Sequence, residues 1–338
     1  MAFLPEVMMG TSKGLTIARL KQIFRRQKNP TWGEDYQPST KAERGEAPAK
    51  SHAFKLGPWK VSGRYIHLLS SPELAAALIG LYHPGVVGLQ EQRMLSPAPK
   101  EHPLTNFPGC IAGGLLPFQG MVAVAQRLDC LDALPKVWGD DPMCETGKRE
   151  LIFPYLGDLL WAVRAADGHI YCVNWSVKSR EEDFKRPFDD RWLSRLSPQP
   201  SAKEQLRHEL ETIYYADAGI RTVHVAGEAI DPHVTGNLRT LFLWHNRAVN
   251  LSLDQQTDLL HRFRTCIDTG MTPLEVIVRL GGNGSTTTND YCNVFYQSIW
   301  RRKLRVDLFR PVLIDRPLRP EAEDVLARYA GWFEEKPC

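Results

Sequence analysis

The sequence lacks the features that mark secreted and membrane proteins. Its seven cysteines include no C-x-x-C pair, and their number is odd, so we expect reduced thiols in a cytosol rather than a disulfide framework. The N-terminus has no apolar core typical of a signal peptide. The longest apolar stretch, residues 111–125, is interrupted by glycine and proline, so we expect no membrane span and no membrane partner.

The sequence also lacks a strong net charge. The 338 residues carry a formal charge of +3, and 43% of them are hydrophobic, which is ordinary for a globular protein. The distribution is less even, because residues 13–60 contain 11 Lys or Arg against 4 Asp or Glu. We expect Arg25, Arg26 and Lys28 in this segment to contact nucleic-acid phosphates, with a solvated arm as the alternative.

Turn and helix signals divide the chain into three parts. Residues 1–60 form a basic N-terminal segment, residues 61–245 a mixed α/β domain, and residues 250–338 a helical C-terminal domain with a tail. Within the second part we predict a helix from Ser71-Pro72, a strand over 86–95 and a hairpin over 151–178 that turns at Asp167-Gly168. A helix over 202–218 and a strand over 220–225 follow. Residues 96–150 show no period and are interpreted as an insertion or lid.

The C-terminal part has a different pattern. We predict helices over 253–268, from Thr272-Pro273, and from Thr288 or Asn289 to about 303. Two β segments, 305–309 and 311–315, are predicted after them. Three helices and a β wing are typical of a winged helix, a module that docks on DNA or protein.

Three residues far apart in the sequence suggest a chemical site. Glu73 lies in the first turn of a predicted helix, while Asp158 and Lys178 lie on the two strands of the predicted hairpin. Two carboxylates can hold a divalent metal, and a nearby ammonium can orient a water. This set predicts a metal-dependent nuclease. Each residue also has an ordinary explanation: a helix-stabilising glutamate, an exposed edge aspartate and a strand-end lysine.

The hairpin register tests this prediction. A two-residue turn at Asp167-Gly168 would place Asp158 opposite Val177, on the other face of the sheet from Lys178. A shared site therefore requires a bulge or an odd-length loop, and we predict one.

The order of several short motifs resembles the TnsA family, the endonuclease subunit of heteromeric cut-and-paste transposases. The similar segments cover most of residues 15–245. They are Gly33-Glu34-Asp35-Tyr36-Gln37-Pro38, Gly63-Arg64-Tyr65-Ile66-His67-Leu68-Leu69-Ser70 followed by Glu73-Leu74-Ala75, Leu89-Gln90-Glu91-Gln92, Asp158, Val177-Lys178, and the stretch from Leu206 to Val225.

The resemblance implies a fold, a chemistry and partners. It implies a restriction-endonuclease-like mixed sheet flanked by helices, with Glu73 and Asp158 as metal ligands and Lys178 as the catalytic lysine. Two Mg²⁺ ions, which Mn²⁺ would replace, are expected to support cleavage at the 5′ ends of a transposon. The implied partners are transposon-end DNA, a TnsB-like DDE transposase and a TnsC-like AAA+ ATPase that docks on the C-terminal part. The implied location is the bacterial cytoplasm.

One position departs from the family pattern. Ser176 stands two residues before the lysine, where Gln or Glu is usual, and a serine hydroxyl is a shorter and weaker ligand. Metal binding would then rely on the Val177 backbone carbonyl or on Glu91.

Further DNA contacts are predicted outside this trio. His67 lies near Glu73 in sequence and could touch phosphate, with a packed histidine as the alternative. Polar residues that step by four along the last predicted helix form a face suited to DNA, or an ordinary solvated face. That face contains Asn289, Asn293, Gln297 and Arg301, with Arg302 beside it.

Three functions follow from these observations. The first is a Mg²⁺-dependent DNA endonuclease within a transposase complex. The second is a scaffold that docks DNA and partners and has lost activity at Ser176. The third is a stand-alone resolvase or repair nuclease of the same fold.

Overall fold

A four-stranded mixed sheet forms the centre of the protein. The structure is a computed structural model that describes residues 15–48, 52–57, 63–110, 113–140, 147–184, 202–281 and 285–335. The strand order is β3-β6-β7-β8, in which β3, β6 and β7 are antiparallel and β8 is parallel to β7. The strands span Val86–Met94, Leu156–Arg164, Ile170–Lys178 and Arg221–Ala226. The predicted α/β class is confirmed, and β3 and β8 lie within one residue of their predicted bounds, whereas the predicted hairpin over 151–178 begins only at Leu156.

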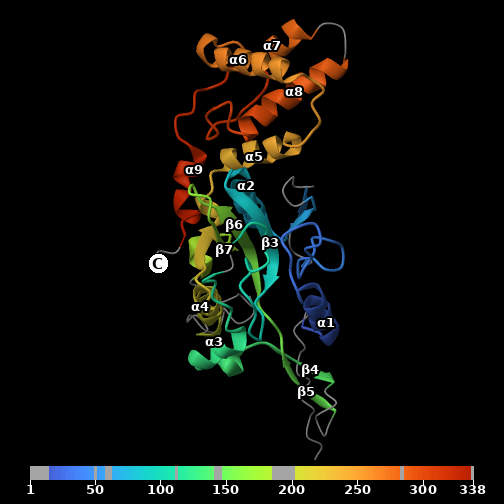
Figure 1. Ribbon diagram of the computed structural model, residues 1–338, viewed down its shortest axis with the longest axis vertical. Helices are drawn as coiled ribbons and strands as arrows, with labels where there is room; N and C mark the ends of the chain where they lie inside the picture. The colour runs from blue at the N-terminus through green and yellow to red at the C-terminus, as the bar shows by residue number, and fades with distance from the viewer. Residues whose placement is uncertain are drawn as a thin grey trace, which may run out of the picture.

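Alternating side chains of the central strands separate two hydrophobic layers. Leu159, Trp161 and Trp175 belong to one layer, which includes helix α2 (Ser71–Tyr82) and helix α5 (Pro232–Trp244). Leu160 and Cys172 belong to the other layer, which includes helices α3 (Met121–Arg127) and α4 (Ala202–Ala216). Helices therefore cover both faces of the sheet (Figure 1).

The segment between β3 and β6 is a structural layer. Its buried side chains pack under the sheet together with α4, and they include Leu104, Phe107, Phe118, Met121, Val124 and Leu134. The interpretation of residues 96–150 as a lid is therefore wrong for their described part. A lid was expected because the apolar residues here follow no helix or strand period.

A small unit flanks the sheet on the N-terminal side. Helix α1 (Ile17–Arg26) packs through Leu20 and Ile23 on the hairpin of β4 (Lys136–Asp140) and β5 (Lys148–Ile152). Strands β1 (Phe54–Leu56) and β2 (Ile66–Leu68) pair beside it. Figure 1 shows the β4–β5 hairpin at one end of the molecule and the C-terminal helices at the other.

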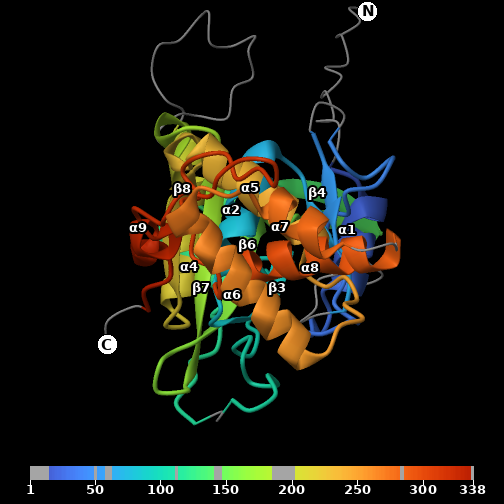
Figure 2. The same ribbon diagram turned by 90° about the horizontal axis from the view of Figure 1, so that it is seen from above.

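The C-terminal helices extend the first hydrophobic layer. Helices α6 (Leu253–Thr269), α7 (Pro273–Leu280) and α8 (Ser285–Trp300) begin close to the predicted positions, and α6 and α7 carry complete capping boxes. Phe263, Ile277 and Phe295 are buried in the same cluster as α2. Figure 2 shows these helices lying over α2 and α5. The break near 245–250 is thus a turn between helices that share one core.

The predicted β wing is wrong. Residues 305–315 form no ladder, and the bridge found there joins Val306 to Pro320. The cause is Asn237 of α5, whose amide donates to the Leu308 and Arg310 carbonyls and accepts from Val312 N. These backbone groups bond to a helix side chain, so they are not available to a second strand.

The C-terminal tail returns to the sheet. Helix α9 (Val325–Arg328) and a 3₁₀ turn, η4 (Ala330–Trp332), bring Phe333 against Trp175 of β7. The remaining 3₁₀ turns are η1 (Leu131–Ala133), η2 (Glu181–Phe184) and η3 (Gly227–Ala229). Among the described residues, no helix has the length and apolar character that crossing a membrane requires.

Candidate active site

The Glu73 carboxylate is held at the start of α2. Ser70 caps the helix, accepting from Glu73 N at 3.2 Å, and its hydroxyl donates to Glu73 Oε1 at 2.9 Å. Leu69 N donates to Glu73 Oε2 at 2.9 Å. The side chain is only 7% exposed. Burial, and next the charge of Asp158, raise the pKa of Glu73 to about 7.

Gln92 connects Glu73 to the sheet. Its Nε2 donates to Glu73 Oε2 at 3.0 Å, and its backbone has φ +50°. The β3–β6 ladder pairs Glu91 with Leu159 and Arg93 with Gly157 but omits the Gln92–Asp158 pair between them. The sequence showed this glutamine only as a neighbour of Glu91, and its left-handed backbone has no sequence signal.

Asp158 lies where the central strands separate. On its other side the β6–β7 ladder ends at Leu159 and Trp175, although both strands continue. Asp158 Oδ2 accepts a hydrogen bond of 2.7 Å from Val177 N instead. Asp158 is half-buried. Neither ladder pairs Asp158 itself. The sheet therefore has an opening at this residue, between β3, β6 and β7.

The predicted odd-length loop is confirmed. Arg164 pairs with Ile170, and Ala165 N bonds His169 O at 2.8 Å, which leaves a three-residue loop over 166–168. Gly168, at φ +95°, provides the left-handed residue of this loop. The register places Leu160 opposite Asn174, so Asp158 and Lys178 fall on the same face of the sheet.

Lys178 ends β7 beside the carboxylates. It is half-buried and pairs with Ala226 of β8. Its charge lowers the pKa of Glu73, opposing the stronger effect of burial. Burial, and next the charge of Lys178, lower the pKa of His208 on α4. The structure thus brings together Glu73, Asp158 and Lys178 from three separate elements.

Ser176 and Val177 make protein contacts instead of the predicted metal contacts. The Ser176 hydroxyl donates at 3.2 Å to Glu211 Oε2 of α4. The Val177 contact seen in the structure is its N–H bond to Asp158, and the role of its carbonyl as a ligand stays a prediction.

Glu91 has a structural role, and its prediction as a metal ligand is wrong. Its carboxylate is fully buried and receives both terminal nitrogens of Arg64, at 2.7 and 2.6 Å. His67 N also donates to it at 3.1 Å. Three donors therefore surround a carboxylate that has no exposed surface.

Only some of the side chains predicted to contact phosphate are exposed. Arg25 and Lys28 of the α1 region are exposed, in line with the prediction. Arg26 instead forms a two-bond pair with Glu46, at 2.7 Å for each bond. His67 is buried, its Nδ1 accepts from Ala42 N at 3.1 Å, and burial lowers its pKa, so a phosphate contact by this histidine is wrong.

The predicted DNA-reading face of α8 is also wrong. Asn293 donates to Ala248 O at 2.8 Å, and Gln297 donates to Trp244 O and Arg247 O at 3.1 and 2.6 Å. Arg302 forms a two-bond pair with Asp324. Asn289 and Arg301 remain exposed. The turn after α5 covers the middle of this face because its carbonyls need these amide donors.

Glu211 is a carboxylate that sequence reasoning missed. It is 4% exposed and lies on the sheet-facing side of α4. Asn174 Nδ2 donates to its Oε1 at 3.0 Å, in addition to the Ser176 bond. Burial, and next Asp158, raise its pKa. The sequence signal for this residue was its position directly after Leu210, which belongs to the apolar side of α4.

The donor chemistry of this site suits a hard divalent cation. Carboxylate, hydroxyl and amide oxygens are the ligands that Mg²⁺ prefers, and a cation would offset the repulsion that raises the pKa of Glu73. Within the described ranges, however, no three His, Cys, Asp or Glu side chains form a ready metal-binding group. Glu73 and Asp158 would therefore hold a cation together with backbone or water oxygens.

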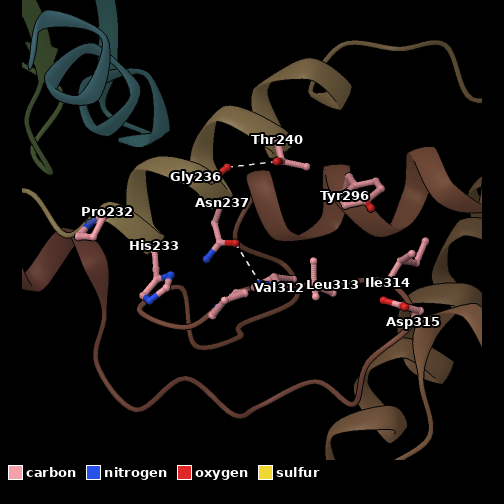
Figure 3. Close-up of a pocket in the computed structure, with 11 residues that line it drawn as sticks. Pro232, His233, Gly236, Asn237, Thr240, Tyr296, Val312, Leu313, Ile314 and Asp315 are labelled. Atoms are coloured by element: carbon pink, nitrogen blue, oxygen red, sulfur yellow. Dashed lines mark hydrogen bonds between the residues drawn. The ribbon is translucent and has the colours of Figure 1, made fainter. Parts of the chain in front are cut away.

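A cavity of about 350 Å³ lies elsewhere. It is lined by α5 and by residues 311–315, with Tyr296 of α8 at its edge (Figure 3). None of the three carboxylates Glu73, Asp158 and Glu211 contributes to its lining.

A search of protein-family models finds none that matches the sequence, and a search of curated proteins finds no significant match.

Proposed function

We propose that the protein is a metal-dependent DNA endonuclease that acts as a subunit of a transposase complex. The observation that carries this proposal is the meeting of Glu73, Asp158 and Lys178 at the opening between β3, β6 and β7. Glu73 and Asp158 would hold a Mg²⁺ ion, which Mn²⁺ would replace, or two such ions. When bound, such a cation polarises the scissile phosphate and lowers the pKa of a water.

The protein groups have distinct roles in this proposal. Lys178, at the end of β7, orients the attacking water and offsets negative charge on the phosphate. Gln92, Leu69 and Ser70 fix the Glu73 carboxylate by hydrogen bonds, so its orientation is set before DNA arrives.

The fold supports the same proposal. A mixed sheet with helices on both faces, and an acidic residue where its central strands separate, agrees with a restriction-endonuclease-like domain. The helices α6–α8 would dock on a TnsC-like AAA+ ATPase. A TnsB-like DDE transposase would cut and join the 3′ ends while this subunit cuts the 5′ ends.

The test is a nicking assay on transposon-end DNA with Mg²⁺ or Mn²⁺, with and without the partner transposase. Asp158→Ala should abolish 5′-end cleavage while leaving partner binding intact. Asp167→Ala, an exposed aspartate in the loop of the same hairpin, is the matched control and should cleave normally. Cleavage retained by Asp158→Ala would remove the basis of the proposal, and loss of partner binding would assign Asp158 a structural role.

A further inference from the structure

Glu211 lies on the α4 side of the sheet, close to the β6 backbone next to Asp158. Asn174 and Ser176 alternate along β7 on the face that carries Lys178, and both donate to the Glu211 carboxylate. By continuation of the register, Ser176 is opposite Asp158. The helix α4 thus brings a carboxylate to the position that Ser176 leaves without one.

The surroundings of Glu211 contain polar atoms without partners. Asn174 Oδ1 and the Tyr215 hydroxyl are fully buried, and neither has a hydrogen-bond partner in the part of the chain that the structure describes. Buried polar atoms are ordinarily satisfied, so such a pair indicates a missing ligand or water. Asn174 Oδ1 is an acceptor, which requires a donor such as a bound water.

Gly157, the residue before Asp158, leaves space for this group. A Cβ at Gly157 would lie 3.1 Å from the Tyr215 hydroxyl and 3.4 Å from Glu211 Oε1. Both oxygens therefore approach the same point of the β6 backbone. The carboxylate, the unpartnered hydroxyl and the unpartnered amide oxygen form one polar pocket beside Asp158.

We propose that Glu211 is the third acidic group of the cation site and replaces the carboxylate that Ser176 does not supply. Its carboxylate and Asn174 Oδ1 would accept hydrogen bonds from the waters of a hydrated divalent cation that Glu73 and Asp158 would hold. Mg²⁺ keeps several of its waters in proteins, so contact through water suits the donor set. This inference rests on the proposed nuclease function.

The experiment measures Mn²⁺ binding by calorimetry on the full-length protein without DNA. Glu211→Gln should weaken binding at least about tenfold, as outer-shell substitutions do. Glu209→Gln, an exposed glutamate on the same helix, is the matched control and should bind as wild type. The double variant Ser176→Glu/Glu211→Gln moves the acid from α4 to β7 and should recover most of the lost affinity. Melting without cation verifies that each variant is folded.

The outcomes separate this inference from the proposed function. Unchanged Mn²⁺ binding in Glu211→Gln, with binding lost in Asp158→Asn, overturns the role of Glu211 alone. Unchanged binding in both variants overturns the cation site itself. A double variant no tighter than Glu211→Gln also overturns the replacement. If Glu211→Gln does not fold, Glu211→Asp keeps the charge, shortens the side chain and should lose Mn²⁺ affinity in the same way.

Discussion

The indole Nε1 of Trp175 donates a 2.8 Å hydrogen bond to the backbone carbonyl of Trp332. Trp175 is fully buried in the sheet, and its ring packs edge-on against Trp332 and Phe333, with centroids 5.6 and 5.1 Å away. The tail of the chain therefore completes the core beside β7, the strand that carries Ser176 and Lys178.

Phe333→Ala should lower the free energy of unfolding by about 3 kcal/mol, because it removes a buried ring from both Trp175 and His83. Urea denaturation followed by tryptophan fluorescence measures the change. Phe24→Ala is the control, since the Phe24 side chain is 40% exposed and should matter much less. Equal effects of the two substitutions would show that the tail is not part of the core.

Glu91→Gln should destabilise the fold by about 3 kcal/mol, because Arg64 would be left buried without its charge partner. The folded variant should bind Mn²⁺ as wild type. Denaturation and calorimetry test the two statements separately. Glu43→Gln, which breaks an exposed pair with Lys55, should cost under about 1 kcal/mol. Lost Mn²⁺ affinity with unchanged stability would instead restore Glu91 as a ligand.

The stability of the protein should fall as pH rises through about 7. The pKa of Glu73 is raised from 4.5 to about 7 by burial and by Asp158, so between these values the folded state holds a proton that the unfolded chain has released. The free energy of unfolding then decreases with pH, by on the order of 3 kcal/mol in total.

Melting temperatures of wild type and Glu73→Gln across this pH range measure the effect. The variant carries no titrating group at this position, so its curve should lack the decrease. A divalent cation favours the ionised carboxylate, and Mg²⁺ should therefore stabilise wild type more at about pH 8 than at about pH 5.5. Parallel curves for the two proteins would contradict the assignment.

Gln297→Leu should lower the free energy of unfolding by about 2 kcal/mol, because it removes the Gln297 hydrogen bond to the Arg247 carbonyl and one of the two to the Trp244 carbonyl, while keeping the side-chain volume. DNA affinity of the folded variant should not change. Asn289→Ala, at an exposed position of the same helix, is the control for stability. Weaker DNA binding by a fully stable Gln297→Leu would support the original DNA-reading face.

Local signals in the sequence account for much of the fold. The helices capped by Ser70, Ser252 and Thr272 begin within one residue of their predicted starts, since a cap depends on atoms within one turn. The alternation in β7 predicted the face of Lys178 from local sequence, whereas the odd-length loop was predicted only because a site shared with Asp158 requires it.

The remaining features depend on contacts between distant segments. Asn237 binds the backbone of residues 308–312 and prevents a wing, and Gln297 binds a turn 50 residues earlier. Glu211 becomes part of the candidate site only because α4 packs over Ser176. The residue pattern of one element does not show which other element it contacts. The polar face of α8 was therefore predicted to contact DNA, and Glu211 of α4 was not predicted as a site residue.

The loop over residues 166–168 constrains the chain by its length more than by its composition. Adding or removing one residue there would shift the hairpin register and turn Asp158 to the opposite face, although the loop is exposed and touches neither carboxylate. Related chains should therefore vary freely in the residues of this turn, apart from Gly168, while insertions and deletions of a single residue are selected against. An alignment gap at this point would distinguish chains that keep the site from chains that have lost it.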